Sequence, residues 1–597
     1  MQEIILGIDL GTTHSAVGVI DSGFPILLAN EEGKRIIPSA VYCAADGTFE
    51  VGAKAWRRRM VDPERVALSV KRWIGRRYHE LDLETAGSLQ QGNDGFPKFH
   101  GYSAERLSAE ILKELKRIAE WRMETSIKKA IITVPAYFND GQRAATIRAG
   151  ELAGLEVVRI LPEPTAAALA YGMDRLAEKS RIAVYDLGGG TFDLSILEMH
   201  DGVFQVLATN GDTRLGGDDL DALLLDVFLK HVGLDEISNT QRSILLTESQ
   251  RVKQALSEVN EVVFSAPFIE GLKSSEMRIT REMLESLAAP WIARTIRHSR
   301  QAMADAGLSV GELNAVVLVG GSTRIPAVRA AVEQCFGRAP DLSQHPDEAI
   351  ALGACIQAGV LSGSLRQVVL LDVTPLSLGI ETLGGLMNVI IARNTTIPCK
   401  AGEMFTNAVD GQTSMKLRVL QGEREMARDN WELGEFTIAF SPSPKGQARV
   451  GVQFSIDSNG ILEVLARDVA SGVDTRVTID RAAVQVDDQA VEAMVSQSVE
   501  HAFTDMAERV FTEAKLKAEE LLAAIDQIEA SGLLLECERA PIADAVIQVR
   551  IELASNSANR LKAAVQVLDQ ATEAMAARLV DQAMEEALQR KDTIHSS

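Results

Sequence analysis

Two short segments of this chain repeat the same order of residue types, an acid followed by glycine and threonine. The first is Gly7-Ile-Asp-Leu-Gly-Thr-Thr13 and the second is Tyr185-Asp-Leu-Gly-Gly-Gly-Thr-Phe-Asp193. Each follows an apolar, β-branched run, which predicts a strand that ends in a tight hairpin. There the Asp can approach a metal ion, and glycine N–H groups can approach phosphate because no Cβ stands in the way. Two copies predict a duplicated domain that holds one nucleotide from both sides.

Other glycine motifs narrow the kind of nucleotide site. The sequence has no G-x-x-x-x-G-K-[ST] pattern, which excludes a P-loop, and no G-x-G-x-x-G that opens a helix, which disfavours a dinucleotide fold. A third glycine turn, Gly320-Gly-Ser-Thr-Arg-Ile-Pro326, follows another predicted strand and could approach the nucleoside. One such turn alone is often only a tight connection, so the evidence lies in the combination.

The elements that position these motifs follow from the apolar periodicity. Residues 1 to about 365 alternate β-branched runs with helical patterns, which predicts an α/β domain. In this part, residues 130–134 and 315–319 are predicted strands, and residues 104–121 and 141–153 are predicted helices.

The apolar period then changes twice along the chain. From about residue 367 to about residue 480 it becomes two, which predicts an antiparallel β domain. After about residue 487 it becomes helical. Gly532 is expected to end one helix of this region and Pro541 to begin the next. Periodicity alone predicts no more than a helical bundle here.

Composition limits the class of protein. At 597 residues, with 46% hydrophobic and 24% charged residues, the chain is expected to be a soluble protein of several domains. No apolar run is long enough for a membrane span, and we expect no signal peptide. The five cysteines lie far apart without a C-x-x-C pair, which favours a reducing, cytoplasmic location. The net charge of −22 argues against general nucleic-acid binding.

Seven blocks in this order resemble the heat-shock-seventy family, the DnaK-type molecular chaperones. The blocks are Gly7-Ile-Asp-Leu-Gly-Thr-Thr13, Val70-Lys-Arg-Trp-Ile-Gly75, Ile132-Thr-Val-Pro-Ala-Tyr-Phe-Asn139, Glu163-Pro-Thr-Ala-Ala-Ala168, Asp186-Leu-Gly-Gly-Gly-Thr-Phe-Asp193, Gly320-Gly-Ser-Thr-Arg324 and Asp372-Val-Thr-Pro-Leu-Ser-Leu-Gly-Ile-Glu381. They lie in order between residues 7 and 381 of the chain. The resemblance implies an ATPase that binds and releases extended apolar peptide segments of unfolded or client proteins under the control of ATP hydrolysis.

The resemblance also implies a multidomain architecture. Residues 1–365 would form an actin-like ATPase domain with two lobes around a cleft, and residues 366–373 the interdomain linker. Residues 374–482 would form a β-sandwich that binds peptide, and residues 483–597 an α-helical lid.

By the same resemblance, Asp9 and Asp186 hold Mg²⁺, largely through its waters, as a hard cation prefers. Lys71 stabilises the charge that develops near the γ-phosphate, although spacing alone would make it a solvated surface lysine. The implied catalytic residues are Lys71, Glu163, Asp186, Thr191 and Asp193. The implied ATP-binding residues are Gly11, Thr12, Thr13, Gly188, Gly189, Gly190, Gly217, Lys253, Ser257, Gly320, Gly321, Ser322, Arg324 and Asp347. The implied cofactors are ATP or ADP and Mg²⁺, with K⁺ as an optional further ion.

The resemblance also implies functional residues outside the cleft. The linker residues are Leu370, Leu371 and Asp372, with Pro135 and Arg143 as a relay between the cleft and the linker. The peptide-binding residues are Ile380, Leu383, Phe405, Ala408, Met415 and Leu417. For each of these residues an ordinary core position is an open alternative, most of all for Ile380 and Leu417.

Partners follow from the family as well. Client polypeptides and a J-domain co-chaperone are expected, for a protein that is mainly a monomer and binds neither nucleic acid nor a membrane. Dependence on a nucleotide exchange factor is left open, because the segment 265–280 looks short where such factors grip. Gln250 also replaces a usual acid near the ribose, and Pro162 replaces a usual Asn. These departures predict a specialised bacterial paralogue, similar to the HscC or HscA types.

Two other classes of protein share some of these features. An actin-like small-molecule kinase or a filament-forming ATPase would share the N-terminal fold, but neither has a place for the β domain and the helices after it. A nucleotide-regulated scaffold that hydrolyses ATP too slowly to cycle stays open as an alternative.

Overall fold

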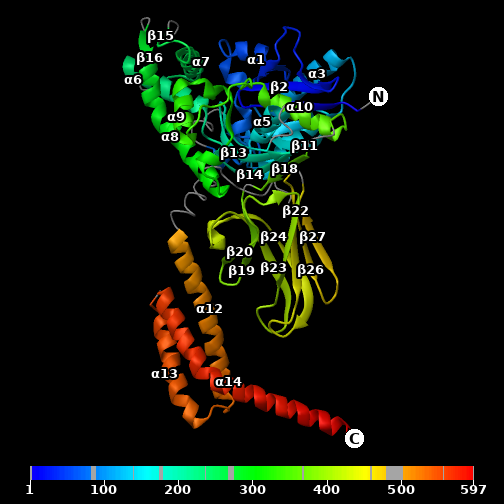
Figure 1. Ribbon diagram of the computed structural model, residues 1–597, viewed down its shortest axis with the longest axis vertical. Coiled ribbons are helices and arrows are strands. Elements are labelled where there is room, and N and C mark those ends of the chain that lie inside the picture. Colours follow the sequence, from blue (N-terminus) through cyan, green and yellow to red (C-terminus); the bar gives the residue numbers. More distant parts are fainter. Residues whose placement is uncertain are drawn as a thin grey trace. The chain divides into compact units, whose positions relative to one another are not determined.

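The computed structural model describes residues 3–81, 89–138, 140–173, 179–234, 237–266, 275–365, 369–374, 376–457, 460–478, 502–555 and 557–595 (Figure 1). The chain divides into two units. The first contains Met1–Leu378, Val389–Gln421 and Trp431–Ala493, and the second contains Gly379–Asn388, Gly422–Asn430 and Met494–Ser597. The four predicted segments stay a prediction, and parts of them (366–368, residue 375 and 479–501) lie outside the described residues.

The N-terminal part of the first unit, which we call lobe I (residues 3–173), is built on a six-stranded sheet. Its strands are β1 (Ile5–Leu10), β2 (His14–Asp21), β3 (Phe24–Leu27), β4 (Ile36–Pro38), β10 (Lys129–Val134) and β11 (Glu156–Pro162). The order is β11-β10-β1-β2-β3, and β4 also pairs with β2. β1 runs parallel to β10 and antiparallel to β2.

The next part, lobe II (residues 179–345), contributes most of a second six-stranded sheet. Its strands are β12 (Ser180–Leu187), β13 (Phe192–His200), β14 (Val203–Asp212), β17 (Ala315–Val319), β18 (Val369–Val373) and β21 (Thr396–Ile397). The order is β17-β12-β13-β14-β18-β21. β12 runs parallel to β17 and antiparallel to β13, so the centre of this sheet repeats the arrangement in lobe I. This repeat agrees with the predicted duplication.

Two helices, α5 (Glu163–Gly172) and α10 (Ala349–Leu361), lie in the core that the two sheets share. The helices cross so closely that a Cβ on Gly353 would collide with the carbonyl of Ala166. On the other face of the lobe I sheet pack α3 (Ala104–Met123) and α4 (Asp140–Leu152). The lobe II sheet is covered by α6 (Gly217–Val232), α7 (Asn239–Leu256), α8 (Arg281–Asp305) and α9 (Pro326–Phe336).

Smaller elements surround this core. Lobe I adds α1 (Ala53–Arg58), η1 (Pro63–Arg65), η2 (Val70–Arg72), η3 (Tyr78–Glu80), β5 (Val41–Cys43), β6 (Phe49–Val51), β7 (Val66–Ala67), β8 (Gln90–Gln91) and β9 (Pro97–Lys98). Lobe II adds η5 (Val310–Glu312), η6 (Gly321–Arg324) and the hairpin of β15 (Glu261–Ala266) and β16 (Ser275–Thr280).

The rest of the first unit is antiparallel β structure, as predicted. One sheet has the order β22-β25-β26-β27, and β23 pairs with β24. The strands are β22 (Cys399–Phe405), β23 (Gln412–Gln421), β24 (Trp431–Ser443), β25 (Val450–Ile456), β26 (Leu462–Asp468) and β27 (Asp474–Thr478). In β25 every second residue from Val450 to Ile456 is buried, which confirms the period of two.

The second unit is mainly helical. Its helices are α12 (Ala502–Ala530), α13 (Glu536–Leu553) and α14 (Ala558–His595), and it also holds most of β19 (Leu378–Thr382), part of β20 (Leu386–Ile391) and η7 (Ala427–Asp429). Arg424 pairs with Asp505, Arg428 with Glu508 and Arg509 with Glu425, which fastens α12 to the segment 422–430.

Several predicted helices and strands are confirmed, with one error. The predicted helix 104–121 is α3, and the predicted strand 315–319 is β17. The predicted helix start at Pro541 is wrong, because α13 begins at Glu536 and contains Pro541. The Glu538 carboxylate accepts a hydrogen bond from the backbone N–H of Leu535 at 3.0 Å, and the helix begins five residues earlier than the proline rule indicated.

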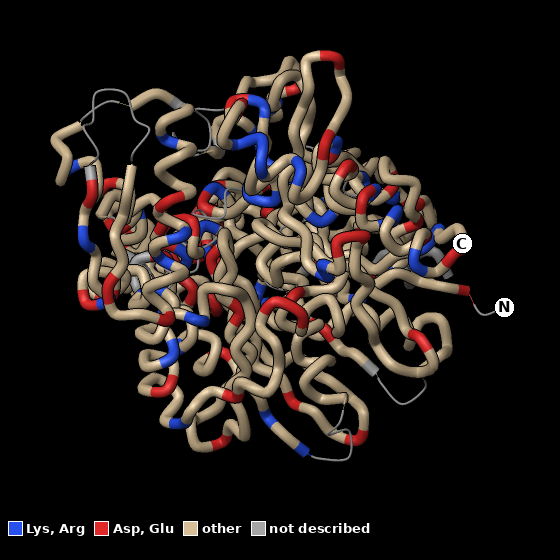
Figure 2. Tube along the Cα trace, turned by 90° about the horizontal axis from the view of Figure 1, so that it is seen from above, with Lys and Arg blue, Asp and Glu red and all other residues tan. Residues whose placement is uncertain are grey.

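Charged residues of both signs are interspersed along the trace in Figure 2. Many form surface ion pairs, such as that of Arg117 with Glu31 and Glu114. Such exposed pairs contribute little to stability and are typical of a solvated surface. Among the described helices, none combines the length and the apolar character that a bilayer span requires.

Candidate functional site

The two acid-glycine-threonine segments are hairpin turns at equivalent places in the two sheets. Asp9 lies near the end of β1 and Asp186 near the end of β12. The turns meet, because a Cβ on Gly189 would collide with the hydroxyl of Thr13 and a Cβ on Gly190 would press on Thr12. Glycine is therefore required at this contact for steric reasons.

Lys71 lies at the same place, and it is buried rather than solvated. It is 6% exposed and forms an ion pair with Glu163, which is also 6% exposed. The structure thus brings lysine and glutamate from distant parts of lobe I into one pair. A buried pair of this kind must be well coordinated, because each charge has lost its water.

Three further carboxyl groups surround this pair. Asp9 accepts a hydrogen bond from the Thr133 hydroxyl at 2.9 Å, and Asp193 accepts one from the backbone N–H of Tyr137 at 3.3 Å. Asp186 Oδ2 and Asp193 Oδ2 are buried without a hydrogen-bond partner. Orphaned carboxylate oxygens in a cluster with a single lysine fit a hydrated cation such as Mg²⁺.

The pKa values of these aspartates are raised. Burial, followed by the charge of Glu163, raises the pKa of Asp9 to about 7 and that of Asp193 to about 8. The same two causes raise the pKa of Asp186, and the charges of Asp193 and Asp9 raise it further. Such mutual repulsion would fall on binding a cation, so the cluster is poised for one.

This cluster predicts a pH-dependent stability. Between about pH 4 and about pH 8 the folded protein binds more protons than the unfolded chain, so the free energy of unfolding should fall as pH rises through this window. We expect the melting temperature of the nucleotide-free protein to fall accordingly in calorimetry, and Mg²⁺ with ADP to reduce the slope. Asp193→Asn should make the melting temperature depend less on pH. An unchanged slope in that variant would rule out the cluster as its source.

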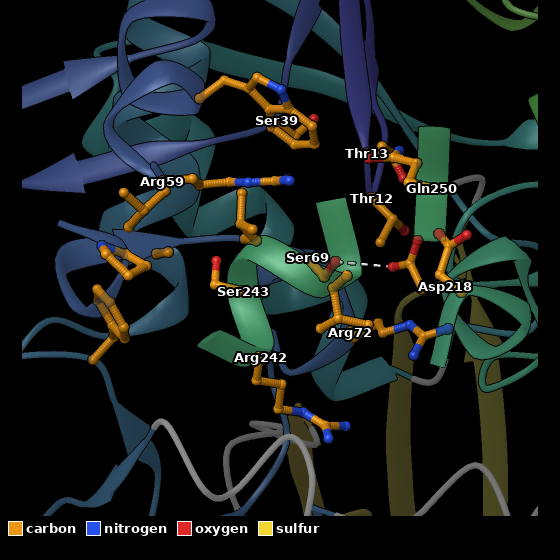
Figure 3. A pocket seen from close by; sticks show the side chains of 18 of the residues that line it. Thr12, Thr13, Ser39, Arg59, Ser69, Arg72, Asp218, Arg242, Ser243 and Gln250 are labelled. Carbon is orange, nitrogen blue, oxygen red and sulfur yellow. Dashed lines mark hydrogen bonds between the residues drawn. The ribbon is translucent and has the colours of Figure 1, made fainter. Parts of the chain in front are cut away.

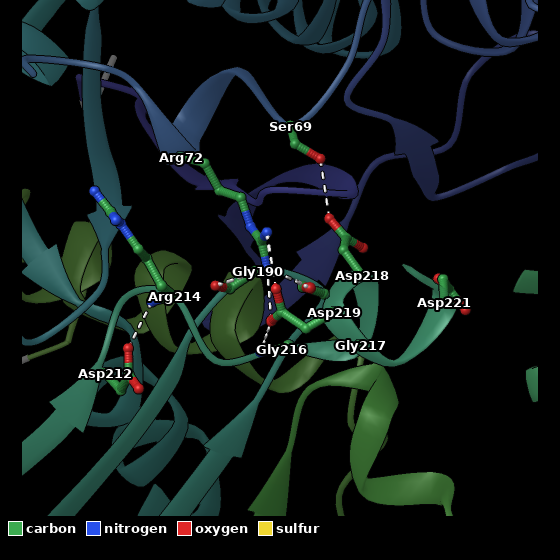
Figure 4. A network of polar contacts seen from close by, with 12 residues as sticks. Ser69, Arg72, Gly190, Asp212, Arg214, Gly216, Gly217, Asp218, Asp219 and Asp221 are labelled. Atoms are coloured by element: carbon green, nitrogen blue, oxygen red, sulfur yellow. Dashed lines mark hydrogen bonds and ion pairs between the residues drawn. The ribbon is translucent and has the colours of Figure 1, made fainter. Parts of the chain in front are cut away.

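A set of polar contacts joins the turn that carries Lys71 to lobe II (Figure 4). Ser69 donates to Asp218 at 3.0 Å, and Arg72 pairs with Asp219 at 3.0 Å. Arg72 also donates to the carbonyl groups of Gly189 and Gly190. These contacts fix η2 against the second hairpin and the start of α6, and so they position Lys71. The sequence analysis did not predict them.

The third glycine turn lies beside the second hairpin, and its approach to a nucleoside stays a prediction. A Cβ on Gly320 would collide with the backbone of Leu187, and the Ser322 hydroxyl donates to the Gly188 carbonyl at 2.8 Å. Arg324 pairs with Asp347 at 2.6 Å, and Gly321 lies beside Asp347.

Lys253 and Ser257 lie at the end of α7. The Lys253 ammonium is 8% exposed and donates to the Gly217 carbonyl at 2.7 Å and to Asp221 at 2.8 Å. Ser257 is the residue that caps α7 and donates to the Lys253 carbonyl. Lys253 therefore joins α7 to the first turn of α6, next to the glycine turns.

A cavity of about 920 Å³ opens beside the hairpins (Figure 3). It begins at Thr12 and Thr13 and continues between the α1 region of lobe I and helices α6 and α7 of lobe II. Gln250 lines it. Of the predicted ATP-binding residues, Thr12 and Thr13 line it, whereas Lys253, Ser257, Arg324 and Asp347 do not. The cavity therefore extends from the hairpins to Gln250, the position that is predicted to lie near the ribose.

The predicted linker residues lie in β18, between β14 and β21 of the second six-stranded sheet. In β18, Leu370 pairs with Phe204 and Leu371 with Gln205 of β14. Asp372 is buried, which raises its pKa, whereas the nearby Arg143 lowers it. Arg143 donates to the carbonyl groups of Phe138 and Ala136, in the turn that follows Pro135.

The predicted peptide-binding residues are divided between the two units. Within the second unit, Ile380 is buried and Leu383 is 63% exposed. In the first unit, Leu417 is buried, Phe405 and Met415 are half-buried, and Ala408 is exposed. Their role in peptide binding stays a prediction.

The comparison with known families agrees with this site. The family model described as Hsp70 protein matches residues 5–581, which is nearly the whole chain and includes both hairpins, the linker and the helical region. The chain belongs to the Hsp70 family.

Proposed function

We propose that this protein is an ATP-driven cytoplasmic chaperone in which ATP hydrolysis controls the binding and release of extended apolar segments of client polypeptides. Hsp70 proteins are ATPases that bind ATP or ADP with Mg²⁺ and act as chaperones on client polypeptides. The observation that carries the proposal is the meeting of two threonine hairpins at a buried cluster of Lys71 and carboxylates. A J-domain co-chaperone is its expected partner.

The residues of the cleft can perform phosphoryl transfer to water, which needs charge neutralisation and positioning more than covalent help. Mg²⁺, held by Asp9 and Asp186, supplies charge neutralisation when bound. Lys71 stabilises the negative charge that develops on the γ-phosphate, and Glu163 orients it through their ion pair. The Thr13 hydroxyl, buried without a hydrogen-bond partner, is free to donate to a phosphate oxygen.

A series of interactions supports coupling between the cleft and the linker. Asp193 accepts a hydrogen bond from Tyr137 N–H, and the neighbouring carbonyl of Ala136 accepts one from Arg143. The charge of Arg143 in turn lowers the pKa of the buried Asp372, without a direct ion pair between them. Hydrolysis that shifts Asp193 would therefore be felt at Asp372, and the two ligands would affect each other's binding reciprocally.

The experiment that tests the proposal is peptide dissociation. We expect ATP to speed the release of a fluorescent apolar peptide from the full-length protein, whereas ADP should not. Thr191→Ala should blunt hydrolysis while nucleotide binding persists, because it removes a hydroxyl beside the phosphates. Stopped-flow anisotropy of the peptide measures its release, and single turnovers with labelled ATP measure hydrolysis. If ATP left peptide dissociation unchanged, the protein would instead be a nucleotide-binding scaffold.

A further inference from the structure

The cavity beside the hairpins contains a buried cation whose charge is poorly compensated. Arg59, the residue after α1, is 5% exposed and lines the cavity. Its guanidinium lies over the Trp56 ring, 3.7 Å from the centroid, and donates to the hydroxyl of Thr247 in α7. Within the described part of the chain, no carboxylate lies within 4.0 Å of it to form an ion pair. Figure 3 shows Arg59 extended across the cavity.

The three aspartates of the cavity are better compensated. Asp219 pairs with Arg72 and Asp221 with Lys253, and Asp218 accepts a hydrogen bond from Ser69. Burial lowers the pKa of Arg59 to about 10, and only the more distant Asp218 and Asp221 oppose this effect. A buried guanidinium without a carboxylate is a site for an oxyanion, and its planar fork matches phosphate.

The position of the cavity identifies the anion. The cavity reaches Thr12 and Thr13, at the phosphate end of the proposed ATP site, and also Gln250, which is predicted to lie near the ribose. Arg59 lines the same cavity as the two threonines, so phosphate that leaves while ADP stays bound has a path past Arg59. Asp218 would repel the ion from its wall, which favours weak, transient binding over retention.

We propose that Arg59 forms a transit site for the phosphate ion that ATP hydrolysis releases. This inference rests on the proposed ATPase function. It gives Arg59 a role after bond cleavage. If Arg59 only held α1 and α7 together, it would act through its hydrogen bond to Thr247 alone.

The test separates cleavage from phosphate release in the full-length protein. Quenched single turnovers with γ-labelled ATP measure cleavage, and a fluorescent phosphate sensor measures release. Arg59→Met should leave cleavage unchanged and slow release about tenfold, the effect of losing one charge-assisted hydrogen bond. Arg59→Lys, which keeps the charge, should restore most of the rate. Thr247→Val removes only the hydroxyl, and it should release phosphate as the wild type does.

A second measurement uses added inorganic phosphate as the probe, with ADP bound. Because Arg59 covers Trp56, phosphate binding should change tryptophan fluorescence saturably, and Arg59→Met should weaken this binding about tenfold. Arg57→Met, an exposed change on the same helix, is the matched control. A response to added phosphate with normal release in Arg59→Met would assign the site to a free anion and overturn the transit role.

Two further results would overturn the inference. The first is phosphate release in Arg59→Met that is as fast as cleavage. The second is phosphate release in Thr247→Val that is slowed as much as in Arg59→Met, which would show that Arg59 has only a structural role. Absence of cleavage in the wild type would instead refute the proposed ATPase function, so the two failures are distinguishable.

Discussion

Replacing Lys71 with methionine is expected to slow ATP hydrolysis about 100- to 1,000-fold, the range found when an enzyme loses one donor to a developing negative charge. Lys71 is the one cation in direct ion-pair contact with the described carboxylates at the meeting point of the hairpins. Nucleotide binding should persist, because the proposed phosphate contacts of the glycine turns and threonines do not depend on Lys71. Single-turnover hydrolysis and ADP titration measure the two effects separately.

The same substitution removes the partner of Glu163, so its effect on folding must be controlled. Glu163 is buried, and an unpaired buried carboxylate is strongly destabilising. Lys71→Met combined with Glu163→Gln replaces the ion pair with two neutral side chains of similar size. This double variant should regain much of the melting temperature without regaining hydrolysis. Hydrolysis near the wild-type rate in a folded Lys71 variant would refute the catalytic assignment.

The sequence predicted the centre of the site well because that centre is local. Asp9 and Asp186 each stand at the end of an apolar strand, next to the glycine and threonine of the same turn. Spacing alone therefore placed acid, backbone and hydroxyl together. The repeated strand order of the two sheets confirms the duplication that the two turns indicated.

The contacts that hold Lys71 could not be predicted, because they join residues far apart in the chain. Ser69 meets Asp218 and Arg72 meets Asp219 across the two lobes. The available signals were weak: an arginine next to Lys71, and two aspartates after a glycine pair. Nothing in the sequence marks Ser69 either, although it adopts a φ of 48°, which is uncommon for residues other than glycine.

The burial of Arg59 could not be predicted from the sequence either. The run Arg57-Arg58-Arg59 has the composition of a solvated helix face. Two of its members are indeed exposed and pair with surface glutamates, whereas the third is buried against Trp56. Which arginine turns inward depends on where α1 ends and on α7 of the other lobe.

The double substitution of Leu370 and Leu371 with aspartate is expected to abolish communication between nucleotide and peptide. Both leucines are half-buried in β18, where they pair with Phe204 and Gln205 of β14. Two new carboxylates would have to be desolvated beside Asp372, which is already buried with a raised pKa. β18 should therefore separate from β14.

Loss of the strand removes the element through which both ligands act, since a coupling free energy requires a part of the protein whose state both ligands change. The ratio of peptide-stimulated to basal hydrolysis should fall to about one, and ATP should no longer speed peptide release. Leu361→Asp, at an exposed position that ends α10, controls for the added charge and should retain the stimulation. Stimulation that survives in the double variant would show that β18 is not the linker, because the same chain would then communicate without it.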